Sequence, residues 1–98
     1  MKIRISKKAS EDIDDIWEYT FKNWSFDQAN KYFNLIMDEI EYLSNNFNSG
    51  KSINHIKLGY KVSKVKSHYI FYKSSKKNEL EIIRVLHQKM DIDNRIGE

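Results

Sequence analysis

HYIFYKSSKKNELEIIRVLHQKMD, residues 68–91, is the stretch that decides the fold. Its first part, residues 68–73, is rich in aromatic and β-branched side chains, which favour a half-buried strand. Its second part, residues 79–87, carries apolar residues at both odd and even positions. Both faces of that strand should therefore be covered, which predicts a central strand. The polar break at residues 74–78 is too short for a crossover, so the two strands should form a hairpin.

Upstream of this hairpin the sequence predicts one strand and two helices. Residues 2–6 alternate polar and apolar side chains, as a strand with one buried face does. From Lys7 to Asn23 the apolar residues recur every three or four positions, which predicts a helix that Ser6 caps. The string SFDQ, which begins at Ser25, has the form of a capping box and precedes a second helical pattern of about 20 residues. The two helices should form an antiparallel hairpin.

The predicted fold class is α+β, with the order β-α-α-β-β-β over a single domain, residues 1–98. Residues 48–58 are expected to be a loop, and a Lys-rich strand should follow it and turn at Lys66. The helical hairpin should cover one face of a small, mainly antiparallel sheet of four strands. The first strand can pair parallel to a later one, and residues 92–98 can form one helical turn. Within the central strand, Ile82 and Ile83 should point to opposite faces.

Composition excludes several classes of protein. The chain has no cysteine, so it forms no disulfides and no thiolate metal sites. No apolar run approaches the roughly 20 residues that a membrane helix needs, and the N-terminus has no apolar signal segment, so a cytoplasmic protein is expected. Charge is divided unevenly. Residues 1–50 carry six basic and nine acidic side chains, whereas residues 51–98 carry eleven and five. The two halves can meet different partners, although ordinary solvated surface explains the same split.

Few residues are arranged as known chemical motifs. The three histidines lack metal-ligand spacing, no serine lies in a nucleophile elbow, and the chain has no Gly-rich phosphate loop, so no metal or cofactor is expected. One set of residues at the ends of the hairpin strands offers acid–base and phosphate-holding groups: His68, Arg84, His87 and Lys89. The alternative interpretation is that both histidines are strand-end residues bonded to the backbone, with no third group to orient them.

Four strings together resemble the ParE branch of the RelE/ParE superfamily of bacterial toxins. They are DIDDIWEYT at residues 12–20, WSFDQA at residues 24–29, GYKVSKVKSHYIFYK at residues 59–73 and IIRVLHQKMD at residues 82–91. In their order and spacing they span almost the whole chain. One departure is the loop after the second helix, which reads FNSGKS and lacks the proline common there.

The resemblance implies the toxin of a type II toxin–antitoxin system, a class linked to plasmid stabilisation. ParE-branch toxins poison DNA gyrase, whereas the RelE branch consists of endoribonucleases that cleave mRNA on the ribosome. Met90 stands where the nuclease type offers a polar group, which favours gyrase inhibition without catalysis, while His87 keeps the nuclease alternative open. An inactive relative that still binds an antitoxin is a third possibility.

The resemblance also implies a cognate antitoxin, of the ribbon-helix-helix type or similar, through which any contact with nucleic acid would be indirect. If two helices cover one sheet face, the other face should expose apolar side chains and attract a partner. Basic residues around that face suit an acidic, amphipathic antitoxin segment. The residues expected near the antitoxin are Tyr60, Lys61, Tyr72, Lys73 and Arg84.

Overall fold

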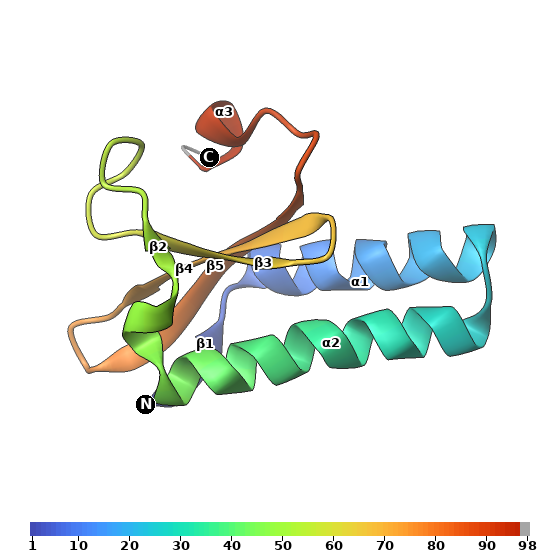
Figure 1. Ribbon diagram of the computed structural model, residues 1–98, viewed down its shortest axis with the longest axis horizontal. Coiled ribbons are helices and arrows are strands. Elements are labelled where there is room, and N and C mark those ends of the chain that lie inside the picture. The colour runs from blue at the N-terminus through green and yellow to red at the C-terminus, as the bar shows by residue number, and fades with distance from the viewer. Residues whose placement is uncertain (97–98) are drawn as a thin grey trace.

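The computed structural model describes residues 1–96, in which two long helices pack on one face of a five-stranded sheet (Figure 1). The elements, in chain order, are β1 (Lys2–Ile5), α1 (Lys7–Asn23), α2 (Phe26–Asn45), the 3₁₀ helix η1 (Phe47–Ser49), β2 (Lys51–Ser52), β3 (Lys61–Val65), β4 (His68–Ser74), β5 (Glu79–His87) and α3 (Ile92–Ile96). The α+β class, the helical hairpin and the β3–β4–β5 meander are confirmed. The prediction of four strands is wrong, because β2 adds a fifth. Residues 97 and 98, part of the expected C-terminal turn, lie outside the described residues.

The sheet order is β1-β5-β4-β3-β2. β1 pairs parallel to β5, from Lys2 opposite Glu79 to Ile5 opposite Ile82, while all the other pairs are antiparallel. β5 thus has a neighbour on each side, as its two-sided apolar pattern predicts. The short pairing of β2 with β3 begins with Lys51 opposite Val62. It lies within a stretch that the sequence predicts as a loop. Both residues of β2 are polar, so they show no alternation of polar and apolar side chains, and no pattern indicated this strand.

Both helices begin at the serines that the sequence indicates. The Ser6 hydroxyl accepts a hydrogen bond from the Ala9 backbone N–H, and the Ser25 hydroxyl accepts one from the Gln28 N–H. Each bond satisfies one of the N–H groups left unpaired in a first helical turn, which is worth about 1 kcal/mol. The helices run antiparallel, and their joined ends project past the sheet (Figure 1).

The main core lies between the helices and the sheet. Ile36, Ile40 and Leu43 of α2 are fully buried against the side chains of the central strands. Tyr72 of β4 is also fully buried there, and its hydroxyl donates to the Phe47 carbonyl at 2.8 Å and accepts from the Gly50 N–H at 3.0 Å. These two bonds fix η1 against β4, because a buried hydroxyl needs partners.

The opposite face of the sheet is covered by the chain itself, so the predicted uncovered apolar face is wrong. Ile53 and Tyr60, which lie in the segment between β2 and β3, pack with Ile96 of α3 on Phe71 and Leu86. In Figure 1 this segment and α3 lie on the side of the sheet away from the helices. Single apolar residues in polar segments supply this cover, and they have no period that a sequence pattern could reveal.

A bulge in β5 sets which side chains reach which face. Phe71 lies opposite Arg84 and Tyr72 opposite Ile82, so Ile83 is the extra residue. Ile82 belongs to the helix-side core and Ile83 packs against the second cluster, which confirms their predicted opposite directions. Because the bulge shifts the alternation by one, Val85 also faces the helices.

No helix in residues 1–96 has the length and apolar character needed to cross a membrane.

Candidate functional site

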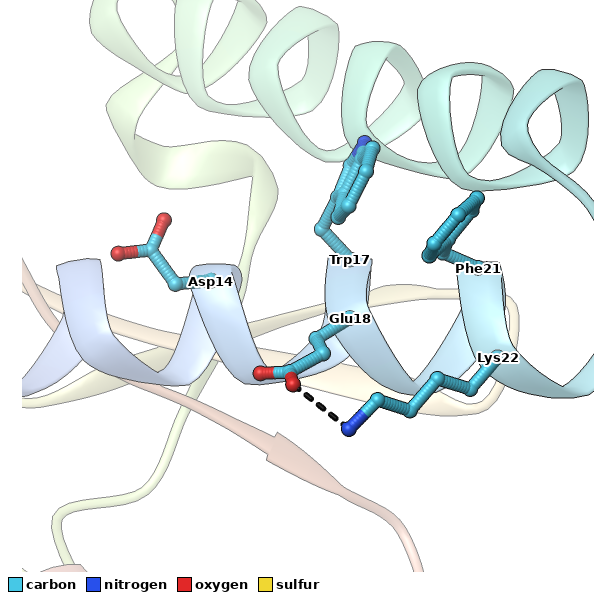
Figure 2. Close-up of a pocket in the computed structure, with 5 residues that line it drawn as sticks. All are labelled: Asp14, Trp17, Glu18, Phe21 and Lys22. Carbon is cyan, nitrogen blue, oxygen red and sulfur yellow. Dashed lines mark ion pairs between the residues drawn. The ribbon is translucent and has the colours of Figure 1, made fainter.

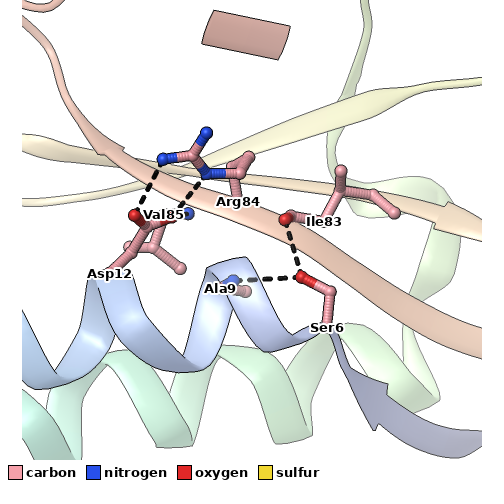
Figure 3. A network of polar contacts seen from close by, with 6 residues as sticks. All are labelled: Ser6, Ala9, Asp12, Ile83, Arg84 and Val85. Atoms are coloured by element: carbon pink, nitrogen blue, oxygen red, sulfur yellow. Dashed lines mark hydrogen bonds and ion pairs between the residues drawn. The ribbon is translucent and has the colours of Figure 1, made fainter. Parts of the chain in front are cut away.

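β5 continues past the end of β1, and side chains of the β1–α1 junction bind its edge there. The last β1 pair is Ile5 with Ile82, whereas β5 runs on to His87. Ser6 donates from its hydroxyl to the Ile83 carbonyl at 2.8 Å and from its backbone N–H to the Ile82 carbonyl at 3.0 Å. Figure 3 shows Ser6 at the start of α1, facing β5. The strand edge therefore keeps its hydrogen bonds after its partner strand has ended.

Asp12 is the second residue at this edge. Its Oδ2 accepts the Val85 backbone N–H at 3.0 Å and the Arg84 Nε at 2.8 Å, and its Oδ1 accepts Arg84 Nη2 at 2.9 Å (Figure 3). Both side chains are nearly buried, with 13% and 10% of their surface exposed. A bidentate pair of this kind has strong geometric specificity. It directs the Arg84 guanidinium towards α1 and fixes α1 to the bulged part of β5.

The two histidines predicted at the strand ends lie face to edge. His68 pairs with His87 across β4 and β5, and their ring centroids are 5.1 Å apart. Tyr32 of α2 contacts the same site: its hydroxyl lies 2.7 Å from His68 Nδ1 and 3.1 Å from the Val65 carbonyl. The sequence suggested no orienting group for this pair, and Tyr32 is that group for His68.

The Tyr32 hydroxyl links His68 to the backbone of β3. The Val65 carbonyl can only accept, so when the Tyr32 hydroxyl donates to it, His68 Nδ1 carries the proton that binds Tyr32 Oη. Burial, and secondarily the charge of His87, lowers the pKa of His68 to about 4. His68 is therefore neutral at physiological pH.

The histidines line one wall of a groove of about 550 Å³ between the helical hairpin and the end of the sheet. Asp12 and Asp15 line it as well, together with the exposed rings of Tyr19 and Trp24. The Asp15 carboxylate disfavours a phosphodiester here, and the Arg84 guanidinium that the nuclease alternative needs to hold one is bound to Asp12. Within residues 1–96 no three His, Cys, Asp or Glu side chains are grouped to hold a metal ion.

Of the residues in the nuclease alternative, the structure brings two together. His68 and His87 are neighbours, but Arg84 turns to Asp12 instead of the histidines. Lys89 contributes its backbone N–H, which donates to His87 Nδ1 at 3.1 Å. This bond agrees with the alternative interpretation for His87, a strand-end histidine bonded to backbone.

Of the residues expected near the antitoxin, Tyr60 and Lys73 form one unit. The Nζ atoms of Lys73 and Lys57 lie 5.6 Å and 5.5 Å from the centroid of the Tyr60 ring. Lys61 lies on the other side of the sheet, with its Nζ 5.9 Å from the Phe47 ring. The expected set therefore divides between the two faces of the sheet.

Tyr72 and Arg84 do not present accessible contact surfaces. Tyr72 has no exposed surface, because its position in β4 points the side chain beneath the helices. Arg84 is 8% exposed and ion-paired with Asp12. The sequence could not tell on which face of the sheet Tyr72 lies, because apolar residues at both parities of β4 hide which side the main core occupies.

Asp12 and Tyr32 are the residues that sequence reasoning missed. Neither residue belongs to a motif in the sequence that would single it out. Their partners are 72 and 36 residues away in the chain, and neither pair forms a local motif.

Comparison with known proteins decides the family. The model of the family described as ParE toxin of type II toxin–antitoxin system, parDE, matches residues 3–92. The chain belongs to this family. It is a type II toxin, in agreement with the four strings that resemble the ParE branch.

Relatives of this ParE-family toxin match over nearly their whole length. A protein named Toxin ParE1 from Caulobacter vibrioides is 34% identical over 94 residues, with 96% of each chain covered. Proteins of the same name from two strains of Mycobacterium tuberculosis are 30% identical over 92 residues, with 94% of each chain covered. A chain of the chromosomal ParDE system from P. aeruginosa has the same fold, with a TM-score of 0.76 at 18% identity. That comparison covers 89% of this chain and 95% of the other.

Proposed function

We propose that this toxin inhibits DNA gyrase in the cytoplasm and that a cognate antitoxin neutralises it by binding. The observation that carries the choice of target is the Asp12–Arg84 pair. It occupies Arg84, the arginine that the nuclease alternative assigns beside the two histidines at the strand ends. Full-length membership of the ParE family supports the same choice.

The nuclease alternative has less support from the site. General acid–base cleavage of RNA needs cationic groups that hold the phosphate near the proton-transferring side chains. Here Asp12 and Asp15 share the groove with the histidines. A toxin that acts through protein contacts requires no such constellation, so we propose a non-enzymatic inhibitor.

The antitoxin surface that we propose centres on Tyr60 and Lys73, with Lys57 beside them. Two ammonium groups near one aromatic ring suit an acidic, amphipathic segment. Lys61 can take part only if the antitoxin reaches over the β2–β3 edge, where β2 pairs with just the first residues of β3. The ParDE neighbour supports an antitoxin partner, and the ribbon-helix-helix type is part of the proposal.

Induced expression with two simultaneous readouts tests the target. DNA breaks and the rate of translation are followed after induction, and purified gyrase is assayed for trapped cleavage complexes. The gyrase proposal expects breaks and trapped complexes before any fall in translation. Cells in which mRNA is cut at defined codons, with no breaks, would contradict it.

His87→Ala identifies the nuclease alternative in the same experiment. This half-buried side chain lies at the end of β5 and lines the groove, so the variant should fold, which a thermal melt checks. Gyrase inhibition should persist in this variant, whereas loss of mRNA cutting with unchanged melting would establish the nuclease. A wild-type chain that harms neither process but binds its antitoxin would be an inactive relative.

A further inference from the structure

Most of the exposed large apolar side chains of the described residues lie on the helical hairpin. Seven of the eleven exposed large hydrophobic side chains in the described residues fall between positions 19 and 42. Among them Phe21 is 46% exposed and Phe26 57% exposed. Aromatic rings gathered on one exposed element generally mark a contact surface for another macromolecule.

Part of this surface is a groove of about 430 Å³ along α1 with an aromatic floor. Trp17 and Phe21 stack with centroids 5.3 Å apart and an interplanar angle of 21°, and Phe26 meets both rings edge-on. Trp17 also donates from Nε1 to Asn30 Oδ1 of α2 at 3.1 Å. The rings are held in place before any partner arrives, which lowers the entropy cost of binding. Figure 2 shows them side by side, both directed towards α2.

Beside its aromatic floor the groove is also lined by acidic side chains. Asp14 and Glu18 lie four residues apart on α1 and both line the groove with the stacked rings, and in Figure 2 their carboxylates point in different directions from the helix. Glu18 bonds Lys22 at 2.8 Å, but both side chains are more than half exposed. An exposed pair of this type contributes little and exchanges readily for a better partner.

The charge of the whole hairpin agrees with that of the groove. Residues 7–45 carry four lysines and nine carboxylates, a net charge of −5, whereas the rest of the chain carries a net charge of +8. An acidic antitoxin segment suited to Lys57 and Lys73 would be repelled from α1. A basic segment is the partner whose charge complements the hairpin.

We propose that the groove formed by Asp14, Trp17, Glu18 and Phe21 receives an arginine or lysine side chain from a basic segment of the toxin's protein target. This inference rests on the proposed function in requiring a protein target. A guanidinium can stack on the Trp17–Phe21 pair while its N–H groups bind one of the two carboxylates, and the charge of the other carboxylate adds to the attraction. The toxin then meets its target with the hairpin and its antitoxin with the sheet.

Charge reversal in the groove tests the proposal. The double variant Asp14→Lys with Glu18→Lys changes two exposed side chains and leaves the core intact. Its matched control, Asp38→Lys with Glu41→Lys, makes the same change of charge at exposed positions on α2. The groove variant should lose growth arrest by at least about tenfold while keeping wild-type antitoxin affinity and melting temperature. The control variant should keep wild-type growth arrest, antitoxin affinity and melting temperature.

A second pair of variants tests the aromatic floor without changing charge. Phe21→Ala removes one ring of the stack, and Tyr42→Ala removes a ring of similar exposure elsewhere on the hairpin. Phe21→Ala should weaken growth arrest and Tyr42→Ala should not, with antitoxin affinity unchanged in both.

Growth arrest that is equal in the groove and control variants would overturn the proposal. So would a wild-type chain that causes no arrest, or an antitoxin affinity that falls together with toxicity. Trapped gyrase complexes, measured in the same cells, separate this inference from the choice of gyrase. If arrest depends on the groove but gyrase is unaffected, the docking surface stands and the proposed target is wrong.

Discussion

At the scale of single residues, Asp12 connects α1 to two consecutive residues of β5. Its carboxylate holds the Arg84 guanidinium, accepts the Val85 N–H and lies on the first half of α1. A strand edge that has lost its neighbour is normally open to pairing with another chain. Here a helix-borne carboxylate occupies one of its donors, so the same residue stabilises the fold and restricts access to the edge.

Replacing this carboxylate should be costly. Asp12→Ala leaves Arg84 nearly buried without its bidentate partner and Val85 N–H without an acceptor. We expect the free energy of unfolding to fall by about 3 kcal/mol. An exposed acidic residue nearby supplies the control: Asp15→Ala should change the free energy of unfolding by less than about 0.5 kcal/mol. Urea denaturation measures both, and similar values for the two variants would show that the pair contributes nothing specific.

His68 should make stability depend on pH. Its pKa is about 4 in the folded chain and about 6.5 when unfolded, so between these values the unfolded chain binds more protons. Stability is therefore complete above pH 6.5 and falls as the pH drops towards 4. Between pH 7 and pH 5 the loss should be about 1–2 kcal/mol.

The control for this pH dependence uses a second histidine. His68→Gln should flatten the change between pH 7 and pH 5, whereas His55→Gln, in the exposed loop, should leave it as in the wild type. Denaturant melts at the two pH values measure the difference. An unaltered pH profile in His68→Gln would assign the dependence to other groups.

At the scale of secondary-structure elements, substitutions in β5 test how its side chains pack on the two faces of the sheet. Ile82 is fully buried beneath the helices and Ile83 is half-buried at the bulge. Ile82→Ala should cost about 2–5 kcal/mol, because it leaves a cavity in the main core. Ile83→Ala should cost distinctly less, since its site can relax into solvent. Urea melts of both variants measure this order, and the reverse order would contradict the assignment of faces.

The elements that sequence predicted correctly are those with a strong local signal. Both helices carry a regular apolar stripe and a serine cap, and β3 to β5 are separated by short polar turns. β2 has two polar residues, Lys51 and Ser52, and its pairing depends on where η1 places it. The bulge at Ile83 was hidden because β5 is apolar on both sides, so a shift by one residue leaves the pattern unchanged.

The residues of the candidate site were named from their types, and the structure shows how they are arranged. The predicted hairpin put His68 and His87 on adjacent strands, and they lie opposite each other because the turn of a hairpin sets the register of its strands. The partner of Arg84 was not predictable, since Asp12 reaches it only after α1 has packed across the sheet. Tyr60 and Lys73 were named together from their residue types, while the burial of Tyr72 required the core side of β4 to be known.

At the scale of the whole molecule, charge separates two surfaces. The acidic hairpin carries the exposed aromatic rings, and the basic remainder carries Lys57 and Lys73 beside Tyr60. A small toxin with opposite charges on its two parts can bind two unlike proteins, each through a different set of residues. The apolar cluster formed by Ile53, Tyr60 and Ile96 keeps the sheet side folded before the antitoxin binds.

Calorimetry with the cognate antitoxin tests this division. If an acidic, disordered segment folds onto the basic side, binding should show a strongly negative heat-capacity change and an affinity that falls as salt rises. Lys73→Glu should weaken binding by about tenfold, because it reverses a charge next to Tyr60. Lys31→Glu makes the same change on the exposed face of α2 and should leave affinity within about twofold. Equal losses in the two variants would mean that the antitoxin responds to net charge alone, and a larger loss for Lys31→Glu would place the antitoxin on the hairpin.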